Sequence, residues 1–148
     1  MAPRTLISIS LLAAAAFAFG QTTPTVYVTI NKNENLSKQK RRDLADSARD
    51  VREQLKKRNS VETAEDRDAA DVLVTILDRR LEVNETGTND WGGALSQTHY
   101  ESRYIVFFRF ENGDTIEESE IALVGAFVTW KRVAGVLAKD AEAWVRRH

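Results

Sequence analysis

The stretch that decides the fold is DVLVTILDRRLEV, residues 71–83. It opens as an unbroken apolar run and continues as an alternation of apolar and charged residues. Since successive side chains of a strand point to opposite faces, strict alternation puts one set on a single face: Leu73, Thr75, Leu77, Leu81 and Val83, interrupted by Arg79. The other face begins with Val72, Val74 and Ile76 and then turns polar. A strand that starts apolar on both faces belongs inside a sheet, and we expect helices to cover the face that carries Leu73, Leu77 and Leu81.

The first twenty residues have the pattern of a secretory signal peptide. Arg4 precedes an apolar, Ala-rich run from residue 6 to 19, and small residues follow at Ala18 and Gly20. As a helix this run would span about 21 Å, which is short of the roughly 30 Å hydrocarbon layer. We therefore predict a signal peptide over residues 1–20, cleaved after Gly20 or Ala18, and one mature domain over residues 21–148 that is secreted or periplasmic.

Composition narrows the classes of partner and cofactor. The 148 residues contain no Cys, which argues against a disulfide scaffold, a thiolate metal site and a lipoprotein acylated on Cys. The formal net charge of −1 gives no reason to expect nucleic acid as a partner. No second apolar stretch is long enough to cross a bilayer. We expect no cofactor, no bound metal and no stable membrane insertion after the signal is removed, and the sequence leaves the oligomeric state open.

The rest of the chain alternates strand and helix patterns. Apolar residues at helical spacing predict two amphipathic helices, the first capped by Ser37 or Asn35 and the second by Thr129, with Trp130 and Trp144 as core anchors of the second. Asn112-Gly113 predicts a hairpin turn, because both residues tolerate positive φ. The expected elements are strands over 26–30, 71–83, 99–111 and 115–123, the last at an edge, and helices over 37–58 and 129–147. Residues 61–63 are a candidate for a further, brief strand. The predicted fold is α+β: a single domain with a mainly antiparallel four- to five-stranded sheet and two long helices packed on one face.

One long irregular segment is expected between the two central strands, over residues 84–98. It contains three Gly residues and a Trp, and its spacing matches no phosphate-binding motif. Long loops of this kind often carry function. The candidate partner-contact residues are therefore Trp91, as the anchor, with Asn89, Asp90, Gly92 and Gly93 around it. The alternative is a lid in which the Trp folds back and seals the edge of the sheet.

Catalytic constellations are scarce in the sequence. The two histidines are His99, at a strand start, and His148, at the terminus, and neither has metal-type spacing to a partner. No nucleophile-elbow pattern is present. A hydrolase that uses a pair of carboxylates or His99 stays open as an alternative, because such groups come together only in the fold.

The layout resembles a set of small exported bacterial α+β proteins. The matching pieces are Ala70-Asp71-Val72-Leu73-Val74, Trp130-Lys131 and Ala143-Trp144-Val145. No activity is established for such proteins, so the resemblance assigns no functional residue. The order of elements is also similar to that of small α+β domains of periplasmic accessory proteins, which bind other proteins. We therefore expect an exported, non-enzymatic binding or accessory protein with another envelope protein as partner. The alternatives are the hydrolase and a purely structural envelope or stress protein.

Overall fold

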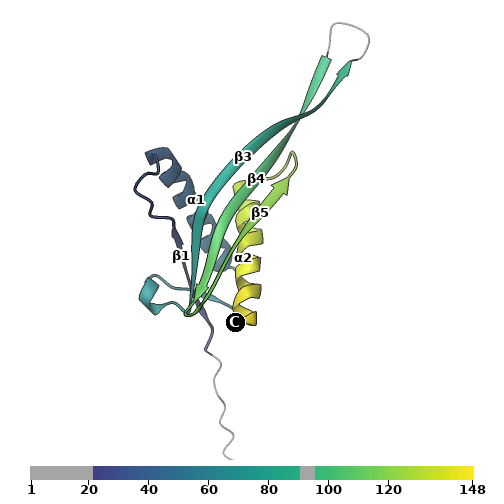
Figure 1. Cartoon of the computed structure of the whole chain (residues 1–148). Helices are drawn as coiled ribbons and strands as arrows, with labels where there is room; N and C mark the ends of the chain where they lie inside the picture. Colours follow the sequence, from purple (N-terminus) through teal and green to yellow (C-terminus); the bar gives the residue numbers. More distant parts are fainter. Residues whose placement is uncertain (1–21, 91–95) are drawn as a thin grey trace, which may run out of the picture.

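A five-stranded mixed sheet forms the centre of the molecule. The computed structural model describes residues 22–90 and 96–148 (Figure 1), so the predicted signal peptide lies outside the described range. The strands are β1 Thr25–Ile30, β2 Glu62–Thr63, β3 Val72–Asp90, β4 Ser96–Asn112 and β5 Thr115–Val124. They are arranged in the order β2-β1-β3-β4-β5, with β1 parallel to both of its neighbours and the other pairs antiparallel. The prediction of an interior strand is confirmed for residues 72–76, where β3 pairs with both β1 and β4, and the predicted edge strand after the hairpin is confirmed as β5.

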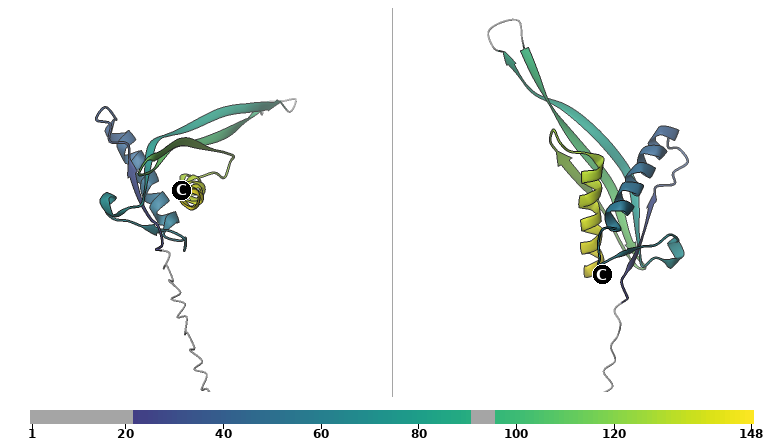
Figure 2. Two further views of the ribbon diagram at one scale, coloured as in Figure 1. Left: turned by 60° about the horizontal axis from the view of Figure 1, so that its bottom comes forward. Right: turned by 180° about the vertical axis from the view of Figure 1, so that it is seen from behind.

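Two long helices, α1 Lys38–Leu55 and α2 Trp130–Arg147, lie on one face of this sheet (Figure 2). Each begins at the predicted cap: the Ser37 hydroxyl accepts from the Lys40 N–H at 3.1 Å, and the Thr129 hydroxyl from the Arg132 N–H at 3.3 Å. Helix α1 ends at Leu55, three residues earlier than predicted. One 3₁₀ turn, Arg67–Ala69, precedes β3. The predicted α+β fold class is confirmed.

The helices cover the opposite face of β3 from the one predicted. Val72, Val74 and Ile76 are at most 2% exposed, whereas Leu73 and Leu77 are only half-buried. The physical reason lies in the neighbouring strands. Across the sheet, Val28 pairs with Val74 and Val74 with Phe110, and the adjacent rows on that face are equally apolar. The face with Leu73 has polar neighbours on both sides, so burying it would desolvate them.

A β-bulge at Leu77 then exchanges the faces of β3. Ile76 pairs with Phe108 and Asp78 with Phe107, so Leu77 has no partner residue in β4. Beyond the bulge, the odd-numbered residues turn to the helix side. The strict alternation assumed from the sequence is therefore wrong after residue 76, and Leu81 and Val83 do not share a face with Leu73.

The bulge determines the direction of the Arg79 side chain. It points to the helices, where its guanidinium forms an ion pair with Asp43 at 3.0 Å and donates to the Ser47 hydroxyl at 3.1 Å. It also lies 4.5 Å from the ring centroid of Trp130, which is only half-buried and meets Tyr104 edge-on at 4.9 Å. One side chain thus joins β3 to both helices at the point where the sheet leaves their cover.

Strands β3 and β4 continue far beyond the predicted strand ends. The irregular segment predicted over residues 84–98 is instead paired strand up to Asp90 and again from Ser96, with a second irregularity in the ladder between Glu85 and Gly87. Only residues 91–95 of that segment lie outside the described range. The Thr and Asn residues that looked like a loop are compatible with a solvent-exposed ribbon that has no buried face to demand an alternating pattern.

The hairpin between β4 and β5 turns one residue later than predicted. Asn112 pairs with Thr115, so Gly113 and Asp114 are the central residues of the turn, and of these two only Gly113 has a positive φ, +52°.

Trp144 of α2 is fully buried between the helix and the sheet. It packs on Phe110 and donates from Nε1 to a Glu117 carboxylate oxygen at 2.7 Å. The prediction that Trp144 anchors the core is confirmed.

Candidate functional site

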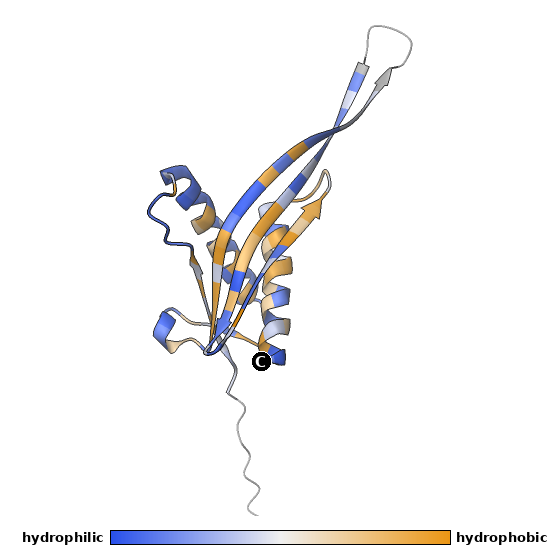
Figure 3. Ribbon diagram, viewed as in Figure 1, coloured by the Kyte–Doolittle hydropathy of each residue, from blue (hydrophilic) through white to orange (hydrophobic). Residues whose placement is uncertain are grey.

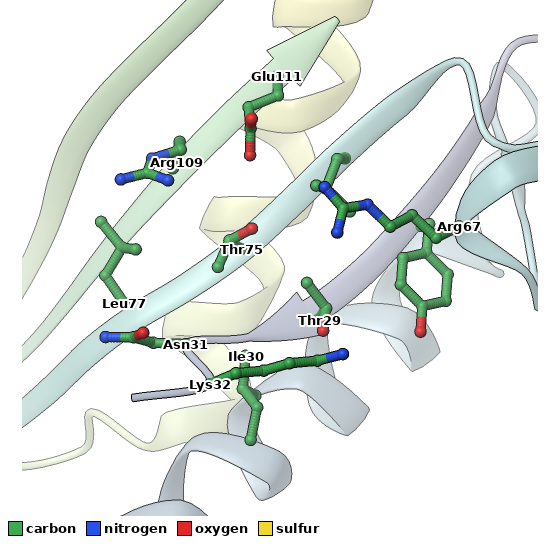
Figure 4. Close-up of a pocket in the computed structure, with 11 residues that line it drawn as sticks. Thr29, Ile30, Asn31, Lys32, Arg67, Thr75, Leu77, Arg109 and Glu111 are labelled. Atoms are coloured by element: carbon green, nitrogen blue, oxygen red, sulfur yellow. The ribbon is translucent and has the colours of Figure 1, made fainter. Parts of the chain in front are cut away.

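A groove lies on the face of the sheet that the helices leave open (Figure 4). Its volume is about 410 Å³, within the usual range for small-ligand sites. The floor consists of two rows of side chains that run across β1, β3 and β4 on their open face. The first row is Tyr27–Leu73–Glu111 and the second is Thr29–Thr75–Arg109. Leu77 at the bulge extends the floor, while Lys32 and Arg67 form part of the rim.

Charge is distributed unevenly across this groove. Figure 4 shows Lys32 on the β1 side, Arg67 reaching from the 3₁₀ turn across β1 towards β3, and Glu111 on the β4 side. Arg109 is already neutralised outside the groove, because it donates to Glu118 through both Nε, at 2.8 Å, and a terminal nitrogen, at 2.5 Å. Within residues 22–90 and 96–148, the side chains of Lys32, Arg67 and Glu111 have no ion-pair or hydrogen-bond partner. Two cations and one carboxylate are therefore available to a ligand.

Sequence reasoning missed these residues. The available signal was the outward alternation of Tyr27 and Thr29 in β1, which matches Leu73 and Thr75 in β3. That signal becomes visible only when the register between the strands is known. Arg67 comes from a 3₁₀ turn that the sequence did not predict, so nothing placed its side chain beside the sheet.

The second exposed feature is the ribbon, which we define as residues 81–90 of β3 and 96–104 of β4. It rises above both helices (Figure 1). The pairing of β1 with β3 ends at Ile76, and that of β5 with β4 ends at Arg103. Towards its end the ribbon is therefore two strands wide, and both of its edges are free among the described residues.

The ribbon exposes apolar side chains on its helix-side face. Leu81 pairs with Tyr104, Val83 with Ser102 and Glu85 with Tyr100, so these residues share that face. The exposed fractions are 51% for Leu81, 57% for Val83 and 64% for Tyr100. Figure 3 shows hydrophobic and hydrophilic positions alternating along this part of β3. We call Leu81, Val83 and Tyr100 the apolar strip.

A further exposed aromatic residue lies outside the apolar strip. Phe127, in the connection from β5 to α2, is 90% exposed. The same connection is held to the ribbon by the Gly125 N–H, which donates to the Ser102 carbonyl at 3.1 Å. Large apolar side chains gathered on one exposed surface are typical of a contact surface for another molecule.

Of the partner-contact residues predicted from the sequence, Asn89 and Asp90 lie in the last part of β3, at the end of the ribbon. Trp91, Gly92 and Gly93 lie outside the described residues. The backbones of Asn89 and Asp90 are paired with Gln97 and Ser96 in the last rungs of the ladder. Their contact role stays a prediction, but the ribbon that precedes them is longer and more exposed than the sequence indicated.

The candidate catalytic residue His99 is exposed and lies in β4 opposite Gly87. Its carbonyl oxygen accepts a hydrogen bond from the Thr86 hydroxyl at 3.2 Å. Across residues 22–90 and 96–148, no group of three His, Asp or Glu side chains is placed to hold a metal ion. Neither helix in those ranges is long and apolar enough to cross a membrane.

Two carboxylates have shifted pKa values, and both connect elements of the fold. Hydrogen bonds from Ser60 and from Arg58, the latter at 2.5 Å, hold the pKa of Glu142 below its usual value and tie the end of α1 to α2. Burial raises the pKa of Asp78, but hydrogen bonds from Lys40 and Arg80 outweigh it, and the net shift is downward. Both sites are ion pairs that join elements of the fold.

No family model and no curated protein matches the sequence. Among solved structures, the fold is similar to a minor lipoprotein from Acinetobacter baumannii, with a TM-score of 0.46, 14% identity, and coverage of 84% of this chain and 94% of that one. It is also similar to an uncharacterized lipoprotein B from Nitrosomonas europaea, with a TM-score of 0.44, 12% identity, and coverage of 84% and 74%. At this level of similarity, no activity, ligand or location is carried over to this chain.

Proposed function

We propose that the chain is an exported, non-enzymatic accessory protein that binds another envelope protein through the ribbon. The apolar strip carries this proposal. An apolar side chain gains about 25 cal/mol per Å² on leaving water, and three large ones at least half exposed on one face give a partner much to bury. The leader-like pattern of residues 1–20 supports export.

The free edges of the ribbon define how such a partner could bind. An unpaired strand edge offers backbone N–H and C=O groups to an added strand, and alternate side chains then supply specificity. A ribbon of two strands is marginally stable in water, so a partner that covers one face and one edge would also order it. The Trp91 segment follows directly in the sequence and would take part in the same contact.

Site-specific photo-crosslinking tests this proposal. A photoreactive residue at Val83 in the native envelope should give one stoichiometric cross-linked partner, whereas the same residue at Ile116, which is 62% exposed on β5, should not. Leu81→Ser with Val83→Ser should abolish capture, and Ile116→Ser serves as the matched control. Trp91→Ala should weaken capture and leave the melting temperature nearly unchanged. Equal capture from both positions, or none from Val83, would contradict the proposal.

A further inference from the structure

The groove on the open face is complementary to a ligand that carries both charges. We propose that it binds a short peptide with free termini, with the carboxylate at Arg67 and Lys32 and the ammonium group at Glu111. This inference does not depend on the proposed function, because the groove lies on the face away from the helices and the apolar strip lies on the helix-side face.

The width of the sheet sets the length of this ligand. Across the floor of the groove, Glu111 on β4 is separated from Tyr27 on β1, in the same row, by two strand spacings, or about 10 Å, and Lys32 lies further along the chain, just after β1 ends at Ile30. An extended peptide advances roughly 3.3 Å per residue, so about three residues cover this width. The groove volume of about 410 Å³ accommodates a ligand of that class.

The floor between the two charged ends suits a peptide backbone. Thr29 and Thr75 present hydroxyl groups that donate to no other group in the described ranges, and Thr75 is only 9% exposed. These hydroxyls can donate to peptide carbonyls or accept from peptide N–H groups. Leu73 and Leu77 lie half-buried beside them and offer apolar surface to small side chains.

Simpler ligands use fewer of these groups. An inorganic anion would satisfy Arg67 and Lys32 but would leave the Glu111 carboxylate without a partner and close to a like charge. A cation would pair with Glu111 and be repelled by Lys32 and Arg67. A zwitterion with separated charges pairs with all three, and a charge-assisted hydrogen bond is about twice as strong as a neutral one.

Titration of the purified protein with trialanine tests the proposal. The backbone amide resonances of β1 and β3 around Thr29 and Thr75 should shift saturably. N-acetyl-trialanine, which lacks the ammonium group, and trialanine amide, which lacks the carboxylate, should each bind at least tenfold more weakly. Inorganic phosphate should give no saturable shift at concentrations where trialanine is bound.

Variants assign each end of the peptide. Arg67→Gln should remove the preference for trialanine over its amide, and Glu111→Gln the preference over its N-acetyl form. Arg132→Gln and Glu101→Gln alter exposed charges outside the groove and should change neither. The proposal is overturned if the three peptides bind the unaltered protein equally, if trialanine does not bind, or if phosphate produces the same shifts. These three results are measured on the unaltered protein, and none of them bears on the proposal that the ribbon binds a partner protein.

Discussion

Removal of the outer part of the ribbon, residues 84–101, should leave the rest of the protein folded. The variant replaces residues 84–101 by Asn-Gly, so that the Val83–Ser102 pair closes a two-residue turn. Six paired rungs of the β3–β4 ladder are lost. Because a hairpin of two strands is at most marginally stable in water on its own, these rungs add little net free energy to the fold, and we expect the free energy of unfolding to change by about 1 kcal/mol or less.

Urea unfolding followed by far-UV circular dichroism measures this change. Phe110→Ala is the control for real core damage: Phe110 is 3% exposed and packs on Trp144, and its loss should cost about 3–5 kcal/mol. If the ribbon deletion costs as much as Phe110→Ala, the ribbon is part of the cooperative core and the division into body and ribbon is wrong. The deletion should also weaken cross-linking from Val83, because Tyr100 and most of the free strand edges are lost, and leave trialanine binding unchanged.

Three further changes test the body of the fold. Trp144→Ala should lower the free energy of unfolding by about 3–5 kcal/mol in urea titrations, and a loss below 1 kcal/mol would mean that the ring is not buried. Because the pKa of Glu142 is lowered in the folded state, its stabilising contribution is present above the ordinary value of 4.5 and is lost as the pH falls through the folded pKa. The melting temperature of Glu142→Gln should therefore fall less between pH 5 and pH 3 than that of the unaltered protein. If the two curves of melting temperature against pH are parallel, ionised Glu142 does not stabilise the fold. Gly113→Ala should cost about 1–2 kcal/mol through its positive φ, and a neutral result would place the turn elsewhere.

Local patterns were enough to predict the order and type of the main elements. Ser37 and Thr129 start the helices because a hydroxyl before an apolar stripe satisfies an otherwise unpaired N–H. The apolar start of the 71–83 stretch identified an interior strand because only a covered strand can be apolar on both faces. These signals are contained within single segments and need no knowledge of the neighbours.

The covered face and the groove depended on pairing, which no single segment reveals. Strict alternation assigns Leu73 to the more leucine-rich face, yet Val74 is the residue that meets apolar partners in both β1 and β4. The bulge at Leu77 leaves no mark in the local pattern, although it determines that Arg79 contacts the helices. Contacts across rows decide burial, and they follow from the register rather than from composition.

The ribbon was missed for a different reason. Hydrophobic alternation reports burial on one face, and the part of the ribbon beyond Val83, which is exposed, has little of it. Thr86, Gly87 and Thr88 therefore look like a loop while they form part of a ladder. The two Gly residues after Trp91 strengthened that interpretation without bearing on the strands themselves.

Thiol labelling tests the central claim, which is that helices cover the Val74 face of β3 and leave the Leu73 face open. Because the chain contains no Cys, Leu73→Cys and Val74→Cys each introduce one thiol, in adjacent positions and opposite directions. In native buffer, Leu73→Cys should react readily with a small thiol reagent and Val74→Cys should react only after urea is added. Rapid native labelling of Val74→Cys together with protection of Leu73→Cys would reverse the two faces and remove the basis for the groove.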